Sequence, residues 1–189
     1  MFDHFGILAP FYENFIKAER PDALIKLADL PIEGALLDVG GGTGRVSQFL
    51  TDLAPQVIVA DLSLKMLVET QFKDNLLAAA SHSEKLPFPD QSFERIIMID
   101  ALHHVCDQQL TADELWRVLK PGGKIILEEP NFNLWFIKIL ALAEKLALMR
   151  SHFLSPEKIR DLFDPFPAKT YIADEGYISR VVITKTIDP

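Results

Sequence analysis

The sequence contains little cysteine and no cluster of basic residues, and each absence excludes a class of protein. Cys106 is the single cysteine among 189 residues, which excludes an internal disulfide framework and favours a reducing compartment. The 19 Lys and Arg residues stand against 27 Asp and Glu residues, for a formal net charge of −8. Because no run of basic residues offers a surface for a phosphate backbone, the composition predicts no nucleic-acid partner.

The sequence also lacks an uncharged apolar run of the length that spans a membrane. Its most apolar segment, 131–149, is interrupted by Lys138, Glu144 and Lys145, whereas a spanning helix needs about 20 largely uncharged residues. The segment 1–15 has neither a basic start nor a long apolar core, so no signal peptide is predicted. We therefore expect a cytoplasmic protein without a membrane span.

Short apolar runs alternate with amphipathic segments along most of the chain. This alternation predicts a parallel sheet with helices on both faces. The predicted strands are 35–39, 56–61, 76–80, 95–100 and 124–130, and the predicted helices between them are 45–53, 63–72 and 109–120, the last ending at Pro121.

The two ends of the chain differ from this alternating centre. Residues 168–187 form two β-rich runs with no room for a helix between them, which predicts an antiparallel hairpin around Glu175 and Gly176. Residues 1–30 are expected to form one or two helices, and 131–165 a further helical segment. With no repeat or linker in the sequence, residues 1–189 are predicted to form a single domain.

A glycine-rich stretch, "LLDVGGGTGRVSQFL" at 36–50, lies between the first predicted strand and the next helix. Open α/β sheets bind ligands at this position. A P-loop is excluded because Gly44 is followed by Arg45 rather than Lys, and the G-x-G-x-x-G dinucleotide pattern fits in neither register. The observed pattern is D-x-G-x-G-x-G, formed by Asp38, Gly40, Gly42 and Gly44, with Gly41 inside it.

Together with three further segments, this pattern resembles the class I S-adenosylmethionine-dependent methyltransferases. The segments are "VIVADLSLKML" (57–67), "SEKLPFPDQSFERIIMIDALHHV" (83–105) and "ELWRVLKPGGKIILEEP" (114–130). They cover 35–130 in the order of that family, with most similarity to its ubiquinone/menaquinone C-methyltransferases and their small-molecule relatives. The resemblance implies a Rossmann-like α/β fold with a mostly parallel seven-stranded sheet, and a cofactor-binding core at 35–130.

The resemblance also implies S-adenosylmethionine as cofactor and a set of residues that bind it. Asp38 would hold the ammonium group, and the glycines would let the backbone approach the tail and ribose. Asp61 would accept hydrogen bonds from the ribose hydroxyls, and Met66 would lie against the adenine. Leu62, Asp100 and Ala101 would flank the cofactor. The alternatives are a turn-stabilising role for Asp38, a helix N-cap for Asp61 and simple core packing for Met66.

One residue departs from the family pattern. Relatives commonly carry an Asp that accepts a hydrogen bond from the adenine amino group, and "SHSEKLPF" places His82 there. A neutral imidazole can accept one hydrogen bond and a protonated one cannot. Adenine recognition is therefore expected from His82 or from the backbone of Ser83.

His103 and His104 follow the fourth predicted strand and are candidate bases, since imidazole titrates near neutral pH. The alternative is that at least one of them packs or caps the next helix, and an acidic quinol hydroxyl would need no base. No Cys, His or Asp set has metal-ligand spacing, so no metal is predicted. We expect Cys106 to be a small buried residue rather than a nucleophile.

The distribution of aromatic residues predicts a small, largely apolar acceptor, with quinol-like and phenol-like compounds included. Aromatic residues crowd the segment 1–30, which resembles the lid that covers the active site in that family, and the segment 131–165, which the resemblance places on the acceptor side. The broad apolar face of 131–149 is explained by core packing, by a homodimer contact or by a pocket lining. Two other functions stay open: a non-catalytic module that binds S-adenosylmethionine or S-adenosylhomocysteine, and an NAD-dependent oxidoreductase, which the glycine spacing disfavours.

Overall fold

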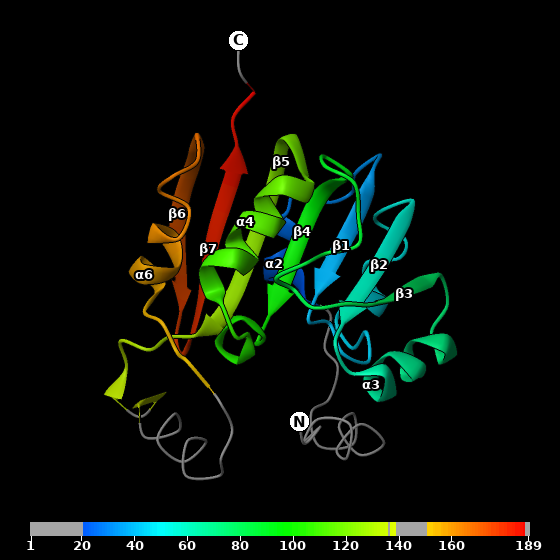
Figure 1. Ribbon diagram of the computed structural model, residues 1–189, viewed down its shortest axis with the longest axis horizontal. Coiled ribbons are helices and arrows are strands. Elements are labelled where there is room, and N and C mark those ends of the chain that lie inside the picture. The colour runs from blue at the N-terminus through cyan, green and yellow to red at the C-terminus, as the bar shows by residue number, and fades with distance from the viewer. Residues whose placement is uncertain (1–20, 136, 139–150, 188–189) are drawn as a thin grey trace.

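The computed structural model describes residues 21–135, 137–138 and 151–187 of the chain, which form one seven-stranded sheet (Figure 1). Its strand order is β3-β2-β1-β4-β5-β7-β6. The strands are β1 (Ala35–Val39), β2 (Gln56–Asp61), β3 (Leu76–Ala80), β4 (Phe93–Ile99), β5 (Leu119–Pro130), β6 (Ala168–Glu175) and β7 (Ile178–Lys185). The first five strands pair in parallel and β7 pairs antiparallel with both neighbours, so the predicted fold class is confirmed.

Buried residues on both faces of the sheet explain why its strands are continuous apolar runs. In neighbouring strands, Leu37, Ile96 and Ile125 pack in one core cluster. The residues beside them, Leu36, Ile97 and Ile126, pack in a second cluster. Successive side chains of a strand point to opposite faces, so a strand covered on both sides needs an apolar residue at every position.

Helices cover each face. The helices α4 (Gln108–Val118) and α6 (Pro156–Asp161) pack on the first cluster and lie in front of the sheet in Figure 1, whereas α2 (Asp22–Leu27) packs on the second. Among the described residues, the remaining helical elements are α3 (Leu64–Val68) and the 3-10 helices η1 (Ser47–Phe49), η2 (Glu69–Phe72) and η3 (Leu102–His104). None of the helices in the described part of the chain has the length and apolar character needed to cross a bilayer.

The predicted helix 45–53 forms only the short η1. Its backbone bonds are mostly of the i to i−3 type, as in Phe49 N–H to Val46 O at 3.1 Å, and polar side chains of the segment bond elsewhere. The Ser47 hydroxyl donates to the Asp38 carboxylate. The Thr51 hydroxyl donates to the Gln48 carbonyl, a side-chain bond to the backbone of the kind that competes with regular helix. The predicted apolar face is nevertheless present, because Leu50 is fully buried in the second cluster.

The segment after α4 also differs from the prediction. The helix ends at Val118 and residues 119–120 are already extended, with Leu119 paired to Phe93. The Lys185 ammonium donates to the carbonyls of Trp116 and Leu119, both at 2.9 Å. These bonds satisfy carbonyl groups at the helix end, so the helix ends before Pro121 is reached.

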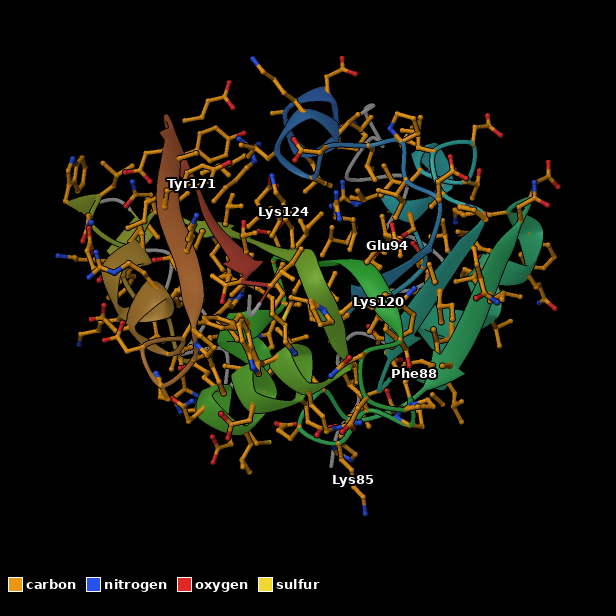
Figure 2. The ribbon with its side chains drawn as sticks, turned by 90° about the horizontal axis from the view of Figure 1, so that it is seen from above. Lys85, Phe88, Glu94, Lys120, Lys124 and Tyr171 are labelled. Carbon is orange, nitrogen blue, oxygen red and sulfur yellow. The ribbon has the colours of Figure 1, made fainter. Side chains whose placement is uncertain are left out.

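The two ends of the parallel strands carry different residues. Strands β1, β2 and β4 have their carboxyl ends at the bottom of Figure 1, where the glycine-rich turn lies. Figure 2 looks onto the opposite end of these strands, where Lys120 and Glu94 lie side by side with 3.8 Å between charged atoms. Both side chains are partly exposed, so this ion pair contributes little stability. Residues 1–20 of the predicted lid at 1–30, and residues 136 and 139–150 of the predicted helical segment 131–165, lie outside the described residues.

Candidate cofactor and acceptor site

The glycine-rich turn begins at the carboxyl end of β1 and is held by its neighbours. Gly40 and Gly42 have φ angles of 72° and 56°, a conformation that favours glycine. The Gly40 N–H donates to the Ala60 carbonyl of β2 at 2.7 Å. A Cβ atom on residue 40 would come to 2.5 Å from the Ala101 Cβ. The absence of a side chain therefore lets the turn pass directly beside the segment that follows β4.

Asp61 at the end of β2 fixes the same turn from the other side. Its Oδ2 accepts the Gly42 N–H at 2.9 Å and its Oδ1 accepts the Ser63 N–H at 2.7 Å. The N-cap residue of α3 is Ser63 rather than Asp61, so the second bond fixes the turn before the helix and the alternative N-cap role of Asp61 is wrong. A carboxylate has about four acceptor sites, so these two backbone bonds leave capacity for hydroxyl donors. Asp61 can serve the turn and a ligand together.

Asp38 lies beneath the turn and is only 2% exposed. Its Oδ2 accepts the Ser47 hydroxyl at 2.6 Å, and it would be 2.4 Å from a Cβ atom on Gly41. Burial raises the pKa of Asp38 from its ordinary value of 3.8 to about 7, an effect that the Ser47 hydrogen bond opposes and the charge of Asp61 reinforces. A cation beside this carboxylate would favour its charged form.

Asp100 and Ala101 lie where β4 ends. Asp100 has a φ of 51°, which is uncommon for a residue other than glycine. Desolvation by the surrounding protein raises the pKa of Asp100 to about 6, and the carboxylates of Glu129 and Glu128 add to the shift. The residue itself stays solvent-exposed, so it lies at the rim of the site and a ligand can reach it.

The predicted adenine side is less complete. Met66 is buried, and its Cε would be 3.0 Å from a Cβ atom on Gly42, whereas Leu62 is 56% exposed. His82 has a side chain 64% exposed, with Nδ1 3.9 Å from Glu84. The Ser83 hydroxyl donates to the same Glu84 at 3.3 Å. The structure thus places Met66 against the turn and gives His82 and Ser83 a shared neighbour in Glu84.

His103 and His104 have different surroundings. His103 is 5% exposed and its Nδ1 contacts Oε2 of Glu129. His104 is half-buried, with Nδ1 3.4 Å from the Ser151 hydroxyl. Burial lowers the pKa of His104 to about 4, and neighbouring His103 adds to the shift, so His104 is neutral near pH 7.

Glu129 is the site residue that the sequence analysis missed. It is 3% exposed, and its Oε1 accepts the N–H groups of Ala101 at 3.1 Å and Leu102 at 2.7 Å. The available signal was a pair of acids, Glu128 and Glu129, at the end of an apolar strand. A buried carboxylate requires hydrogen-bond partners, which that pattern alone does not identify.

Two further expectations concern metal and cysteine. Among the described residues, no three His, Cys, Asp or Glu side chains are grouped so as to hold a metal ion. The expectation that Cys106 is buried is wrong, because it is exposed. It lies in the loop before α4, where its backbone N–H donates to Glu84 at 2.8 Å, so the backbone rather than the thiol is anchored.

Comparison with known proteins agrees with this geometry. A family model described as "Methyltransferase domain" matches residues 37–127. The "Ubiquinone/menaquinone biosynthesis C-methyltransferase UbiE" of Cellvibrio japonicus is 36% identical over 166 residues, which cover 76% of this chain and 67% of that protein. The "Demethylmenaquinone methyltransferase" of Paenarthrobacter aurescens is 30% identical over 116 residues, covering 59% of this chain and 46% of that protein.

Solved structures share the fold. An S-adenosylmethionine-dependent methyltransferase from Thermotoga maritima has a TM-score of 0.77 at 21% identity, with 98% of this chain and 100% of that chain covered.

The chain matches only part of the length of its sequence relatives. The matched regions span 42% of the UbiE protein of Hahella chejuensis and 67% of that of Cellvibrio japonicus. The sheet order, the glycine turn and these likenesses together define a methyltransferase-type α/β domain.

The chain belongs to the class I S-adenosylmethionine-dependent methyltransferases, and among them it is similar to the UbiE C-methyltransferases. The residues present fit the cofactor of this family. The buried Asp38 carboxylate, whose charged form burial disfavours, suits an ammonium group, and the Asp61 carboxylate at the turn suits hydroxyl groups.

Proposed function

We propose that the protein transfers a methyl group from S-adenosylmethionine to a small, largely apolar acceptor with a quinol-like or phenol-like ring. The observation that carries the proposal is a stack of three rings that includes His103, two residues after the Ala101 that borders Gly40 of the glycine turn. The Phe153 ring lies 4.2 Å from the His103 ring at 14°, and the Phe132 ring lies 5.8 Å from Phe153 at 9°. Both phenylalanines are half-buried, so part of their surface is accessible.

Near-parallel rings favour a flat, apolar partner. Phe132 follows β5, Phe153 precedes α6 and His103 lies in η3, so three segments distant in sequence converge at one end of the sheet. Ligand sites are mostly apolar with a few polar groups that fix orientation, and offset stacking of aromatic rings adds about 0.5–1.5 kcal/mol per pair. The names of the UbiE and demethylmenaquinone methyltransferases support a quinol ring in particular.

When bound, the cofactor supplies an activated methyl group on a sulfonium, and the chain's residues bind and align the reactants. In this proposal Asp61 accepts the ribose hydroxyls, Asp38 holds the ammonium group, and Met66 lies against the adenine. Ala101 and Asp100 border the cofactor on the acceptor side. His103 and His104 remain the candidate proton acceptors, and the low pKa of His104 makes it the weaker base.

The test uses the protein with methyl-labelled S-adenosylmethionine and three separate acceptor pools. These are hydroquinones and phenols with apolar substituents, polar metabolites, and RNA. We expect label in the first pool. Asp61→Ala is the control, since loss of the ribose carboxylate should lower the transfer rate at sub-saturating cofactor while leaving saturated rates less affected.

The outcomes separate the alternatives. Label only in RNA or only in polar metabolites would overturn the acceptor class. S-adenosylhomocysteine binding without transfer to any pool would favour the non-catalytic binding module instead. Absence of cofactor binding in calorimetry at millimolar ligand would reject the methyltransferase function altogether.

A further inference from the structure

Glu84 lies in the loop between β3 and β4 and contacts the backbone just before α4. Its Oε1 accepts the N–H groups of Cys106 at 2.8 Å and Asp107 at 3.2 Å, and its side chain is 16% exposed. Burial alone would raise the pKa of Glu84, but hydrogen bonds from backbone N–H groups and from Ser83 outweigh it and hold the pKa below the ordinary 4.5. The carboxylate is therefore charged near pH 7, which suits its place at a helix N-terminus.

The loop that carries Glu84 is attached to the cofactor side of the site. The Ser81 N–H donates to the Asp61 carbonyl at 3.0 Å, and the Asp61 carboxylate accepts the Gly42 N–H of the glycine turn. The Lys85 N–H then donates to the His82 carbonyl at 3.1 Å. Glu84 thus lies in one tight turn directly after the strand end that pairs with Asp61.

The other end of the link is the residue at which α4 begins. Asp107 is the N-cap of α4, and its Oδ1 accepts the Leu110 N–H at 3.0 Å. Its carbonyl accepts the Thr111 hydroxyl at 2.9 Å. That hydroxyl also lies 3.4 Å from the Ser83 hydroxyl, which is long for a hydrogen bond. The contacts of Glu84 are therefore the shorter connection between the loop and the start of the helix.

The start of α4 in turn holds the rings on the acceptor side. The Gln108 Nε2 donates to the Leu102 carbonyl at 3.1 Å and to the His152 carbonyl at 2.7 Å. The His152 N–H donates to the His103 carbonyl at 2.7 Å. The stacked rings of His103 and Phe153 thus belong to two segments that are joined to each other and to the first turn of α4.

We propose that Glu84 is a positioning residue for methyl transfer, which keeps the ring stack of His103 and Phe153 in place relative to Asp61. The inference rests on the proposed function. Glu84 acts through the backbone of residues 106 and 107 and is not assigned to a reactant. Its effect on the rate follows from geometry, since a misplacement of about 1 Å can slow a reaction by about 10²-fold.

Three variants of Glu84 separate the link from its charge. Glu84→Ala removes the acceptor of both N–H groups, so the transfer rate at saturating S-adenosylmethionine and naphthohydroquinone should fall at least about tenfold. S-adenosylhomocysteine affinity should stay within about threefold of wild type, because Asp61 and the glycine turn keep their contacts. Glu84→Gln keeps an oxygen that accepts both N–H groups, so its rate should stay within about threefold of wild type.

Glu84→Asp is the converse of the glutamine variant. It keeps the charge but is shorter by one methylene, so it falls short of the two N–H groups and should slow transfer as Glu84→Ala does. It also replaces the alanine variant if that protein does not fold. A rate that followed the charge instead of the link would make Glu84→Asp resemble wild type and Glu84→Gln resemble Glu84→Ala, and would overturn the proposal.

Glu114→Ala is the matched control, because Glu114 also ties the β3–β4 loop to α4. Its Oε2 accepts the Leu86 N–H at 2.8 Å, and its Oε1 pairs with Arg117 at 2.7 Å. This link lies further along the helix, away from the ring stack. The control should lower the melting temperature while the transfer rate, measured well below that temperature, stays at the wild-type value. A purely structural role of Glu84 would give the same result for Glu84→Ala.

Amide hydrogen exchange by nuclear magnetic resonance tests the positioning without an acceptor, in the presence of S-adenosylhomocysteine. The reporters are the N–H groups of His104 and His152, which donate to the Ala101 and His103 carbonyls. We expect both to exchange at least about tenfold faster in Glu84→Ala and at the wild-type rate in Glu84→Gln and Glu114→Ala. Unchanged exchange in Glu84→Ala would overturn the proposal, as would an unchanged transfer rate. Failure of the proposed function would instead appear as a wild type that methylates neither naphthohydroquinone nor any acceptor pool.

Discussion

At the scale of single residues, the buried Asp38 couples the charge of the protein to that of its ligand. The carboxylate has a pKa of about 7 because it is buried, so near neutral pH a large fraction of the ligand-free protein carries a proton there. A bound ammonium group favours the ionised form. Binding at this residue is therefore linked to proton release.

We predict that S-adenosylhomocysteine affinity is nearly constant above about pH 7.5 and falls below pH 7, approaching tenfold per pH unit. The reason is that the proton on Asp38 must leave before the carboxylate can hold the ammonium group. Calorimetry in two buffers with different ionisation enthalpies would measure the affinity and the released protons together. Asp38→Asn should bind more weakly and with a flat pH dependence, and a wild-type affinity that does not vary with pH would contradict the coupling.

The same residue predicts a pH-dependent difference in stability without ligand. The folded pKa of about 7 lies above the ordinary 3.8, so the folded state holds an extra proton between these values. Protonation of Asp38 therefore contributes its full stabilisation below about pH 4, and this contribution to the free energy of unfolding falls by roughly 4 kcal/mol as the pH rises to 7. The difference in free energy of unfolding between the wild type and Asp38→Asn, measured in urea, should show this decline, and at pH 7 the variant should be at least as stable as the wild type. A difference that stays constant across pH would contradict it.

Some site residues could be predicted from the sequence and others could not. Asp38 and Asp61 were identifiable because each ends a strand beside the glycine turn, and parallel strands bring their carboxyl ends to one edge. Glu129 was not, because its partners at Ala101, Leu102 and His103 become neighbours only when β4 and β5 pair. Sequence alternation indicates that Glu128 and Glu129 face opposite sides of the sheet, but not which of them meets a histidine.

At the scale of elements, the strands followed from the sequence more directly than the helices did. Short apolar runs predicted the strands 56–61 and 76–80, and two β-rich runs with no room for a helix between them predicted the hairpin at 168–187. The helix after the turn was predicted from spacing alone, and spacing does not reveal that Ser47 bonds to Asp38. The apolar face persisted where the helix did not, since Leu50 packs in the core from η1 and its adjoining turns.

The contact between the glycine turn and the β4–α4 segment gives a prediction at this scale. Gly40→Ala should lower the free energy of unfolding by about 2–4 kcal/mol, because it adds backbone strain at a positive φ and a clash with the Ala101 Cβ. Ala101→Gly removes the atom that clashes, so the double variant should recover at least about 1 kcal/mol relative to the sum of the single changes. A double-mutant cycle by urea unfolding measures this, and additive costs would exclude the contact.

At the scale of the whole molecule, β7 joins the two ends of the fold. It lies between β5 and β6, and Val181, Val182 and Ile183 contribute to both core clusters. The parallel half that carries the glycine turn is thus continuous with the hairpin through one strand. The site residue Glu129 belongs to β5, which pairs with β7 from Lys124 to Pro130.

We predict that a chain ending at residue 166 does not unfold cooperatively, because loss of β6 and β7 exposes apolar residues on both faces of β5. Calorimetry and circular dichroism should show a broad transition in place of a sharp one. A chain ending at residue 185 keeps every strand and is the control, which should melt like the full sequence. A sharp transition in the shorter chain would show that the parallel half is stable alone.

The position of β7 also has a consequence for biosynthesis. Ribosomes deliver the chain from its amino end, so β5 emerges well before the strand that must pair along its free edge. Until residue 185 has left the exit tunnel, that edge is available to other nascent chains. The speed at which codons 131–185 are translated therefore sets how long the unprotected edge persists, and synonymous changes there can alter the yield of folded protein without altering any residue.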